Sequence, residues 1–157
     1  MSKTNKKVLI CSNTSSSSYV FRRDLLMRLE ERGQLIGVFS IKEDYIPQTP
    51  DIGFIKAISL VMKSPVPTLI HGFTHAGNLI AALISILTLS PLILTVTGMG
   101  RAYSLDGPRE KLQRAFLWCF YKICIVMNAK LIVQNEDDRS FFIEMGAKLI
   151  YLTRGSG

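Results

Sequence analysis

Short apolar runs, several of them rich in β-branched residues, alternate with longer helix-like stretches along all 157 residues of this sequence. The short runs have the length of buried strands, and the longer stretches show helical periodicity or helix end signals. This alternation predicts crossover connections, and therefore a parallel sheet with helices on both faces. The predicted strands span residues 7–11, 35–41, 68–73, 92–97, 131–134 and 148–152, and the predicted helices span residues 19–32, 52–63, 78–88, 108–128 and 137–145.

End signals support these boundaries. Gly33 and Gly146 are placed as C-terminal caps, Pro108 suits the first turn of a helix, and Asn135 precedes a helix as its N-cap. Residues 42–51 are polar and contain two prolines, so we expect a loop there. No repeat or linker divides the chain. The sequence therefore predicts a single α/β domain over residues 1–157, with a Rossmann-like parallel sheet of about six strands.

The composition is that of a compact globular domain, because 48% of the residues are hydrophobic and 20% are charged. The formal net charge of +7 favours anionic partners such as phosphorylated ligands or acidic lipid headgroups. Basic residues are dispersed without a recognised nucleic-acid module, so nucleic acid is not expected as a partner. Cys11, Cys119 and Cys124 lack the spacing of a disulfide framework or a zinc site. We expect three reduced core thiols in a cytoplasmic protein, and no bound metal.

Residues 79–96 form the one segment with the hydropathy of a membrane span, since their number approaches the ~20 residues that cross a bilayer. Pro91 interrupts this segment. A helix that ends near Thr88 and a buried strand that begins at Leu92 explain the same residues. The apolar run at residues 8–11 is too short for a signal peptide, and we interpret it as the first strand.

The predicted strand at residues 92–97 leads into Gly98 and Gly100, which is typical of a strand that ends in an open loop at the carboxyl edge of a sheet. Arg101 and Tyr103 follow and offer a cation and an aromatic face. A tight turn with an exposed arginine explains the same residues, and the sequence does not decide between the two interpretations.

Three further polar segments follow predicted strands, at residues 13–18, 71–78 and 134–138. Because parallel strands point the same way, all four segments should meet at one edge, where α/β sheets bind ligands. The serine-rich segment lacks the glycine spacing of a dinucleotide site and the lysine of a P-loop. It is as consistent with helix capping as with binding an anion or sugar hydroxyls.

The two histidines receive different interpretations. We expect His71 to be a buried residue that holds a backbone group. His75 opens the next helix and is a candidate neutral hydrogen-bond partner or base near pH 7. Three consecutive acids, Glu136, Asp137 and Asp138, are interpreted as helix-cap and dipole partners.

The stretch at residues 114–127 is apolar nearly all round, which by default indicates a buried core helix. An exposed part of it, with basic residues beside aromatic ones, would instead contact an anionic bilayer surface. The candidate membrane contacts are Arg109, Lys111, Arg114, Trp118 and Lys122.

Four segments in order read SNTSSSSYVFRRDLLMRLEERG, HGFTHAGNLIAAL, TVTGMGRAYS and VQNEDDRSFFIEMGAKLIYLTRGSG. Together they resemble the N-terminal domain of family 4 glycosyltransferases of the GT-B fold, in the bacterial branch that builds capsular and lipid-linked oligosaccharides. The matching stretches of that branch read N-F-R-x-P-L after a small polar loop, then F-T-x-K-P-N, T-V-T-G-L-G-Y-A-F, Q-N-x-D-D-x-x-x-F and G-S-G-V-D. Each motif alone is modest, but the ordered set covers most of the chain.

The resemblance implies an enzyme peripheral on the inner face of the plasma membrane, which transfers a sugar from a nucleotide sugar with retention and without an obligatory metal. The N-terminal domain of such enzymes binds the membrane and an acceptor, often an undecaprenyl-diphosphate-linked saccharide, and the C-terminal domain holds the nucleotide sugar. Carried over to this sequence, the candidate catalytic residues are His75 and Arg101, and Gln134, Asn135, Asp137 and Asp138 are expected to be architectural. The candidate acceptor-binding residues are Asn13, Ser15, Ser16, Thr74, Asn78, Thr97, Gly98, Gly100 and Tyr103.

The chain departs from this family at several positions. The second segment, with His75 and Ala76, lacks the lysine and the proline of the branch's motif, and Arg101 replaces a tyrosine. Residues 41–68 are fewer than in the relatives, so a third strand is expected to be missing. The sequence stops at Gly-Ser-Gly where the family continues into its donor domain. We therefore expect this domain to bind no cofactor itself and to lack transferase activity alone.

Two hypotheses follow. The first is the acceptor- and membrane-binding half of a lipid-linked sugar transferase, truncated or split, with a companion donor-binding chain. The second is a non-catalytic Rossmann-like module that binds a phosphorylated small molecule. Self-association through an apolar flank stays open under both hypotheses.

Overall fold

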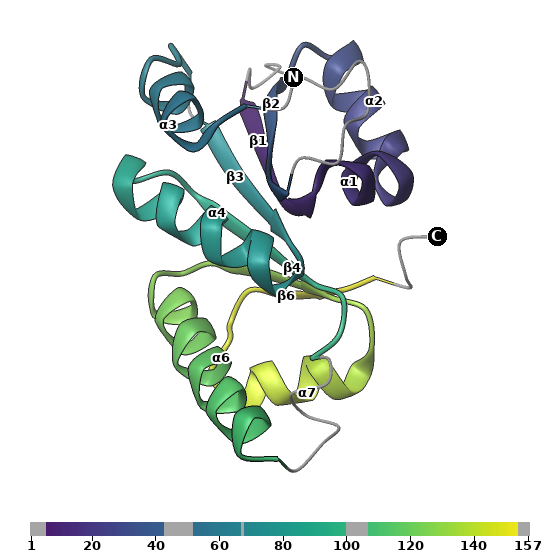
Figure 1. Cartoon of the computed structure of the whole chain (residues 1–157), viewed down its shortest axis with the longest axis vertical. Helices are drawn as coiled ribbons and strands as arrows, with labels where there is room; N and C mark the ends of the chain where they lie inside the picture. Colours follow the sequence, from purple (N-terminus) through teal and green to yellow (C-terminus); the bar gives the residue numbers. More distant parts are fainter. Residues whose placement is uncertain (1–5, 43–51, 67, 100–106, 154–157) are drawn as a thin grey trace.

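The computed structural model describes residues 6–42, 52–66, 68–99 and 107–153, which form one parallel sheet flanked by helices (Figure 1). The strand order is β2-β1-β3-β4-β5-β6, so the predicted Rossmann-like α/β architecture is confirmed. The strands are β1 (Lys7–Thr14), β2 (Leu35–Lys42), β3 (Thr68–Phe73), β4 (Leu92–Val96), β5 (Lys130–Val133) and β6 (Ile150–Leu152). The helices are α1 (Ser15–Phe21), α2 (Arg23–Glu31), α3 (Phe54–Met62), α4 (Thr74–Thr88), α6 (Pro108–Val126) and α7 (Glu136–Glu144).

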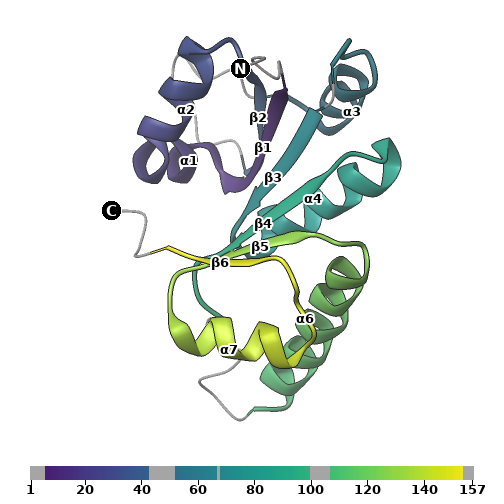
Figure 2. The same cartoon turned by 180° about the vertical axis from the view of Figure 1, so that it is seen from behind.

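The helices lie on both faces of the sheet, as predicted (Figures 1 and 2). Helices α1 and α2 pack over β1 and β2 on one face, and α3, α4, α6 and α7 pack on the other. The reason is the handedness of parallel crossovers. The β1–β2 connection runs in the opposite direction along the sheet from all later connections, so a right-handed path places its helices on the opposite face.

The side chains of alternate strand residues separate two cores. Leu9 and Cys11 of β1 belong to the larger core, which lies under α3, α4, α6 and α7. Ile10, between them, belongs to the smaller core with Leu26 and Phe73, under α1 and α2. Each fully buried side chain of this size contributes roughly 1.5–3 kcal/mol of transfer free energy. Most of the stabilisation therefore lies on the four-helix face.

Some segments predicted as loops belong to regular elements. The polar segment after the predicted first strand is not a loop, because β1 continues to Thr14 by pairing with Lys42 of β2. Helix α1 begins at the next residue, and the single predicted helix 19–32 is divided at Arg22 into α1 and α2. Helix α4 begins at Thr74, four residues before the predicted start. The strand–helix connections at this edge are thus much tighter than the polar composition indicated.

The predicted caps are confirmed. Gly33 and Gly146 have positive φ angles of 61° and 97°, the left-handed conformation that ends helices. Pro108 lies in the first turn of α6. The Asn135 side-chain oxygen accepts a hydrogen bond of 2.7 Å from the backbone N–H of Asp138, and so caps α7.

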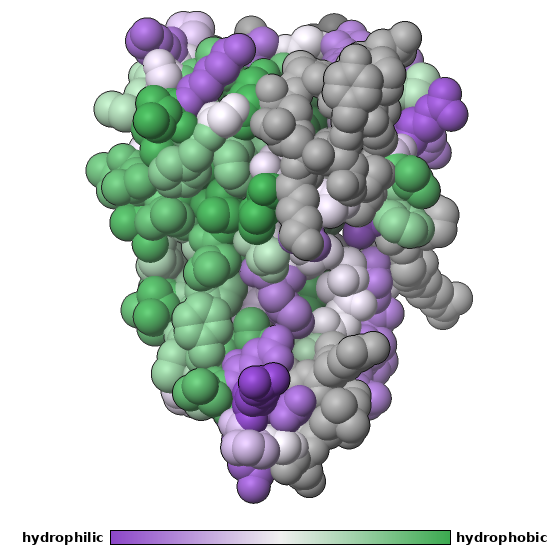
Figure 3. Space-filling model, in the orientation of Figure 1, coloured by the Kyte–Doolittle hydropathy of each residue, from purple (hydrophilic) through white to green (hydrophobic). Residues whose placement is uncertain are grey.

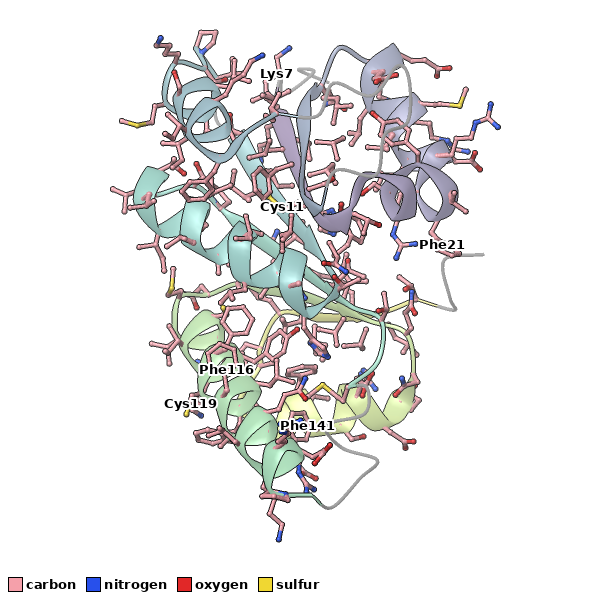
Figure 4. All side chains as sticks on the ribbon, viewed as in Figure 1. Lys7, Cys11, Phe21, Phe116, Cys119 and Phe141 are labelled. Atoms are coloured by element: carbon pink, nitrogen blue, oxygen red, sulfur yellow. The ribbon has the colours of Figure 1, made fainter. Side chains whose placement is uncertain are left out.

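The cysteines are all free thiols, but they do not all belong to the core. Cys11 and Cys124 are buried, as predicted, and burial raises the pKa of the Cys124 thiol to about 12. The prediction for Cys119 is wrong, because this residue is exposed on α6 (Figure 4). The near-continuous apolar composition of α6 conceals which of its sides faces the sheet.

Helix α4 ends at an unusual residue. Leu89 terminates the helix with a φ angle of 53°, and its side chain is 92% exposed. A leucine in the left-handed region is strained, and here no burial offsets the strain. None of the described helices is long and apolar enough to cross a membrane.

We predict that Leu89→Gly stabilises the protein, by roughly 1 kcal/mol, because glycine adopts a positive φ without strain and little buried surface is lost. Urea denaturation followed by circular dichroism measures this change. Leu89→Ala is the matched control, since it removes the same side chain without relieving the strain. Equal stabilisation by both substitutions would show that the backbone angle is not the cause.

Candidate binding site at the carboxyl edge

Two glycines bring α4 directly onto the sheet. A Cβ atom built on Gly72 would lie 2.6 Å from Asn78 Oδ1 and 2.9 Å from the Ala81 Cβ, and one on Gly77 would lie 2.7 Å from the Cys11 carbonyl oxygen. Such distances leave no room for a side chain. The start of α4 is therefore held against the ends of β1 and β3, where the strand order reverses. Open α/β sheets bind ligands at this switch point.

A cavity of about 270 Å³ opens at this edge, next to the break between α1 and α2. Its size is close to the lower end of the range for small-molecule sites, about 300–1,000 Å³. Polar groups and two aromatic rings line it together. The described lining residues are Ser12, Ser18, Phe21, Arg22, Phe73, Thr74, Thr97 and Gln134.

Two hydroxyl groups of this lining lack a partner. The Ser18 side chain is 2% exposed, and neither its Oγ nor the buried Oγ1 of Thr74 has a hydrogen-bond partner among the described residues. Thr74 also has a φ angle of 65°, which is strained for a β-branched residue. Unpaired buried hydroxyls are costly, and backbone strain collects at binding sites. Both features are those of a site that a polar ligand completes.

Arg22 supplies a cation at the same place. Arg22 lies between α1 and α2, and its side chain is only partly exposed. Its guanidinium lies 4.7 Å from the centre of the Phe73 ring and donates a hydrogen bond of 2.8 Å to the Phe21 carbonyl. Partial burial lowers the pKa of Arg22, yet arginine stays charged in proteins. The spacing Ser18–Arg22–Leu26 would have indicated this position, because it continues the buried stripe of α2.

His71 lies behind Arg22 and Phe73. The rings of His71 and Phe73 have centroids 4.2 Å apart, and His71 Nε2 is hydrogen bonded to the Thr95 hydroxyl at 2.8 Å. Desolvation, with a contribution from the Arg22 charge, lowers the pKa of His71 to about 3. The prediction that His71 is a buried structural residue is confirmed. Its observed partner is a side-chain hydroxyl and not the predicted backbone group.

His75 is directed toward α6. Its Nδ1 and the Tyr121 hydroxyl are 2.8 Å apart, and the Asn78 amide donates to the same hydroxyl at 3.0 Å and to the Thr95 carbonyl at 3.1 Å. Burial lowers the pKa of His75, although the carbonyls of Gly98 and Met99 and the Asp138 charge act in the opposite direction. His75 is therefore an uncharged imidazole whose orientation is fixed by its hydrogen bond to Tyr121. Its catalytic role stays a prediction.

The other candidate residues are placed as follows. Asn13 lies near the end of β1, at the same edge as Thr74. Ser15 and Ser16 belong to α1, and Asn78 is fully buried, so its observed contacts are structural. Thr97 lines the cavity, and Gly98 has a positive φ of 130°. Gly100, Arg101 and Tyr103 lie outside the described residues.

The candidate membrane residues divide into two kinds. Trp118 is 47% exposed, and Arg109 and Lys111 are exposed near the start of α6. Lys122 has a structural contact, because its Nζ donates a hydrogen bond of 2.7 Å to the Met145 carbonyl on the α7 side. Arg114 is only partly exposed.

The acids at the start of α7 are confirmed as cap and dipole partners. Asp138 accepts a hydrogen bond from the Asn135 amide at 2.9 Å, and Glu136 pairs with Arg139 at 3.2 Å. Among the described residues, no group of three or more histidines, cysteines or acids could hold a metal ion. The described lining of the cavity offers hydrogen-bonding groups and the positive charge of Arg22.

Comparisons with known proteins do not assign the chain: no family model and no curated protein matches it.

Stability should fall as the pH is lowered through the window between about 6.5 and about 3. Unfolded His71 takes up a proton near its ordinary pKa of about 6.5, whereas the folded state resists protonation until about pH 3. At pH 5 the loss from His71 is about 2 kcal/mol. Urea denaturation at pH 7.5 and pH 5 measures it, and His71→Gln should reduce the difference between the two. An unchanged difference in this variant would contradict the assignment.

Proposed function

We propose that this chain is the acceptor- and membrane-binding half of a retaining glycosyltransferase, which works on a lipid-linked saccharide while another domain or chain holds the nucleotide sugar. The cavity at the switch point is the observation that carries this proposal. It combines a partly desolvated arginine with two buried hydroxyls that lack partners among the described residues. Hydroxyls suit the hydroxyl groups of a sugar, and arginine suits a phosphate.

The residues that carry the family resemblance also line this cavity. Phe21 and Arg22 occupy the F-R of the first motif, Phe73 and Thr74 the F-T of the second, and Thr97 lies in the third. Segments far apart in the sequence thus supply one site. The parallel sheet already brings these segments to one edge, and the presence of several motif residues in the lining of a single cavity supports a shared ligand class.

A division of roles follows from the chemistry of the lining. Arg22 would hold a phosphate of the acceptor's diphosphate, and the Phe73 ring beneath its guanidinium fixes the orientation of the charge. The hydroxyls of Ser18 and Thr74 would hydrogen bond the first sugar. Arg101 remains our candidate for the cation that stabilises the departing diphosphate of the donor, as a preorganised charge does in such transfers.

The outer surfaces of α3, α4 and α6 supply the proposed membrane contact. Figure 3 shows a broad apolar surface over this side of the molecule. Along these three helices five basic residues stand against one acid, Glu110, a balance suited to anionic headgroups. The exposed apolar residues include Ile55, Met62, Leu83, Leu87, Leu112, Phe116, Trp118 and Ile123.

Binding of a short-prenyl diphosphate-linked monosaccharide tests the acceptor site. Titration of the isotope-labelled protein should shift the backbone resonances of Ser18, Thr74 and Thr97. Thr74→Gly should weaken binding at least fivefold while it stabilises the fold, because it relieves the φ angle of 65° and removes the hydroxyl. Arg22→Gln should weaken binding at least tenfold, and Arg23→Gln, its exposed neighbour on α2, is the matched control.

The same titration separates the two function hypotheses. Sugar phosphates without a lipid should bind at least tenfold more weakly than the lipid-linked probe. Equal binding would favour a module that recognises a phosphorylated small molecule. Shifts confined to residues far from the carboxyl edge would contradict the proposed site itself.

Trp118, the one tryptophan of the chain, reports on the membrane contact directly. Vesicles that contain phosphatidylglycerol should shift its fluorescence to shorter wavelength, and pure phosphatidylcholine vesicles should not. In flotation, Phe116→Ser should lower the bound fraction at least threefold, because it removes exposed apolar surface from α6, the helix that carries Trp118. Tyr151→Ser, which changes an exposed aromatic residue on β6, is the control. An unchanged fluorescence would contradict the membrane contact.

A further inference from the structure

A second, larger groove lies at the opposite edge of the sheet, where the strands begin. It measures about 870 Å³ and lies between the ends of α4 and α6, over the first residues of β3, β4 and β5. Its walls are mainly apolar, with Leu69, Ile86, Leu92 and Ile93 among them. This volume lies within the range of sites for small molecules and is more than the carboxyl-edge cavity offers.

Basic side chains line the rim of the groove. Lys6 and Lys130 line it, and both side chains are exposed at the ends of β1 and β5. No acidic residue is among its described lining residues. Thr68 also lines the groove, and its Oγ1 is buried without a hydrogen-bond partner among the described residues. The two lysines lie on either side of the groove, because β3 and β4 separate β1 from β5. An apolar trough with cations on its rim is complementary to a molecule with an alkyl chain and an anionic head.

Core packing does not explain the conformation and exposure of Leu89. It contributes to the wall of the groove, yet its side chain is 92% exposed and its φ angle of 53° is one that leucine avoids. Hydrogen bonds hold the chain around Leu89: Ser85 Oγ donates to the Ser90 carbonyl at 2.6 Å, and the Thr88 and Ser90 hydroxyls are hydrogen bonded at 2.9 Å. A leucine with a strained backbone and a solvent-exposed side chain beside an apolar groove is suited to contact with an apolar ligand.

We propose that this groove binds a single-chain anionic amphiphile, with its alkyl chain along the wall formed by Ile86 and Leu89 and its anionic head at one of the rim lysines, Lys6 or Lys130. The site is independent of the acceptor site, since the two lie at opposite edges of the sheet. It is also distinct from the proposed membrane contact, because it takes one chain into a groove rather than docking a helix surface on a bilayer.

Three monomeric probes test the proposal: decyl phosphate, decyl maltoside and butyl phosphate, each below its micellar concentration. Decyl phosphate should shift the backbone resonances of Thr68, Leu89 and Asn128, and the other two probes should bind at least tenfold more weakly. The double variant Lys6→Gln/Lys130→Gln should weaken decyl phosphate at least tenfold. Lys56→Gln/Lys63→Gln, which removes two exposed lysines on or beside α3, should not.

Leu89→Gly provides a variant whose folding is not at risk, because the substitution relieves the strained angle. It should weaken decyl phosphate at least fivefold. The two sites are reported by different resonances, Thr68, Leu89 and Asn128 for this groove and Ser18, Thr74 and Thr97 for the acceptor site, which keeps failure of one separate from failure of the other.

Several outcomes would overturn the proposal. If decyl maltoside bound with the same affinity as decyl phosphate, Lys6 and Lys130 would not recognise an anionic head. Their role would then be limited to interaction with the negative C-terminal ends of the α4 and α6 dipoles. Shifts confined to the exposed surface of α6, or binding to vesicles alone, would assign the interaction to the membrane-facing surface instead.

Discussion

The direct contact between the start of α4 and the ends of β1 and β3 is the constraint on which the rest of this structure depends. Gly72 and Gly77 permit it, because a Cβ on either would lie within 2.9 Å of atoms of the neighbouring backbone or side chains. The contact makes the strand–helix connection so short that Thr74 must take a positive φ. Close packing at one edge is thus linked to strain at the proposed site.

That contact also organises the polar groups around it. Asn78, one turn into α4, joins the Thr95 carbonyl of β4 to the Tyr121 hydroxyl of α6, and Tyr121 in turn holds His75. On the other face, Arg22, Phe73 and His71 form a stack that ends at the Thr95 hydroxyl. Both networks meet at β4, so the two faces of the sheet position the carboxyl edge together. The network is not fully satisfied, because Asn78 Oδ1 and His75 Nε2 are buried without a hydrogen-bond partner among the described residues.

The two edges of the sheet have opposite chemistry. Among the described residues, the carboxyl edge combines Arg22 with hydroxyls in a small cavity, and the amino edge combines Lys6 and Lys130 with a larger apolar groove. Between them, α3, α4 and α6 present an apolar and basic surface (Figure 3). A protein that handles a lipid-linked sugar has to accommodate a saccharide, a phosphate and a hydrocarbon at once. The separation of these chemistries over one domain is consistent with that task, and each part can be tested on its own.

The sequence by itself determined the six parallel strands, most helix caps and the edge at which polar segments gather, because hydrophobic period and end signals are local properties. It could not place Arg22 in the cavity or direct His75 toward Tyr121, since both depend on how distant helices pack. It also mistook Cys119 for a core residue, because α6 is apolar on its exposed side as well. Only the tertiary structure decided which apolar residues are buried and which hydroxyls lack partners among the described residues, because both follow from contacts between segments far apart in the chain.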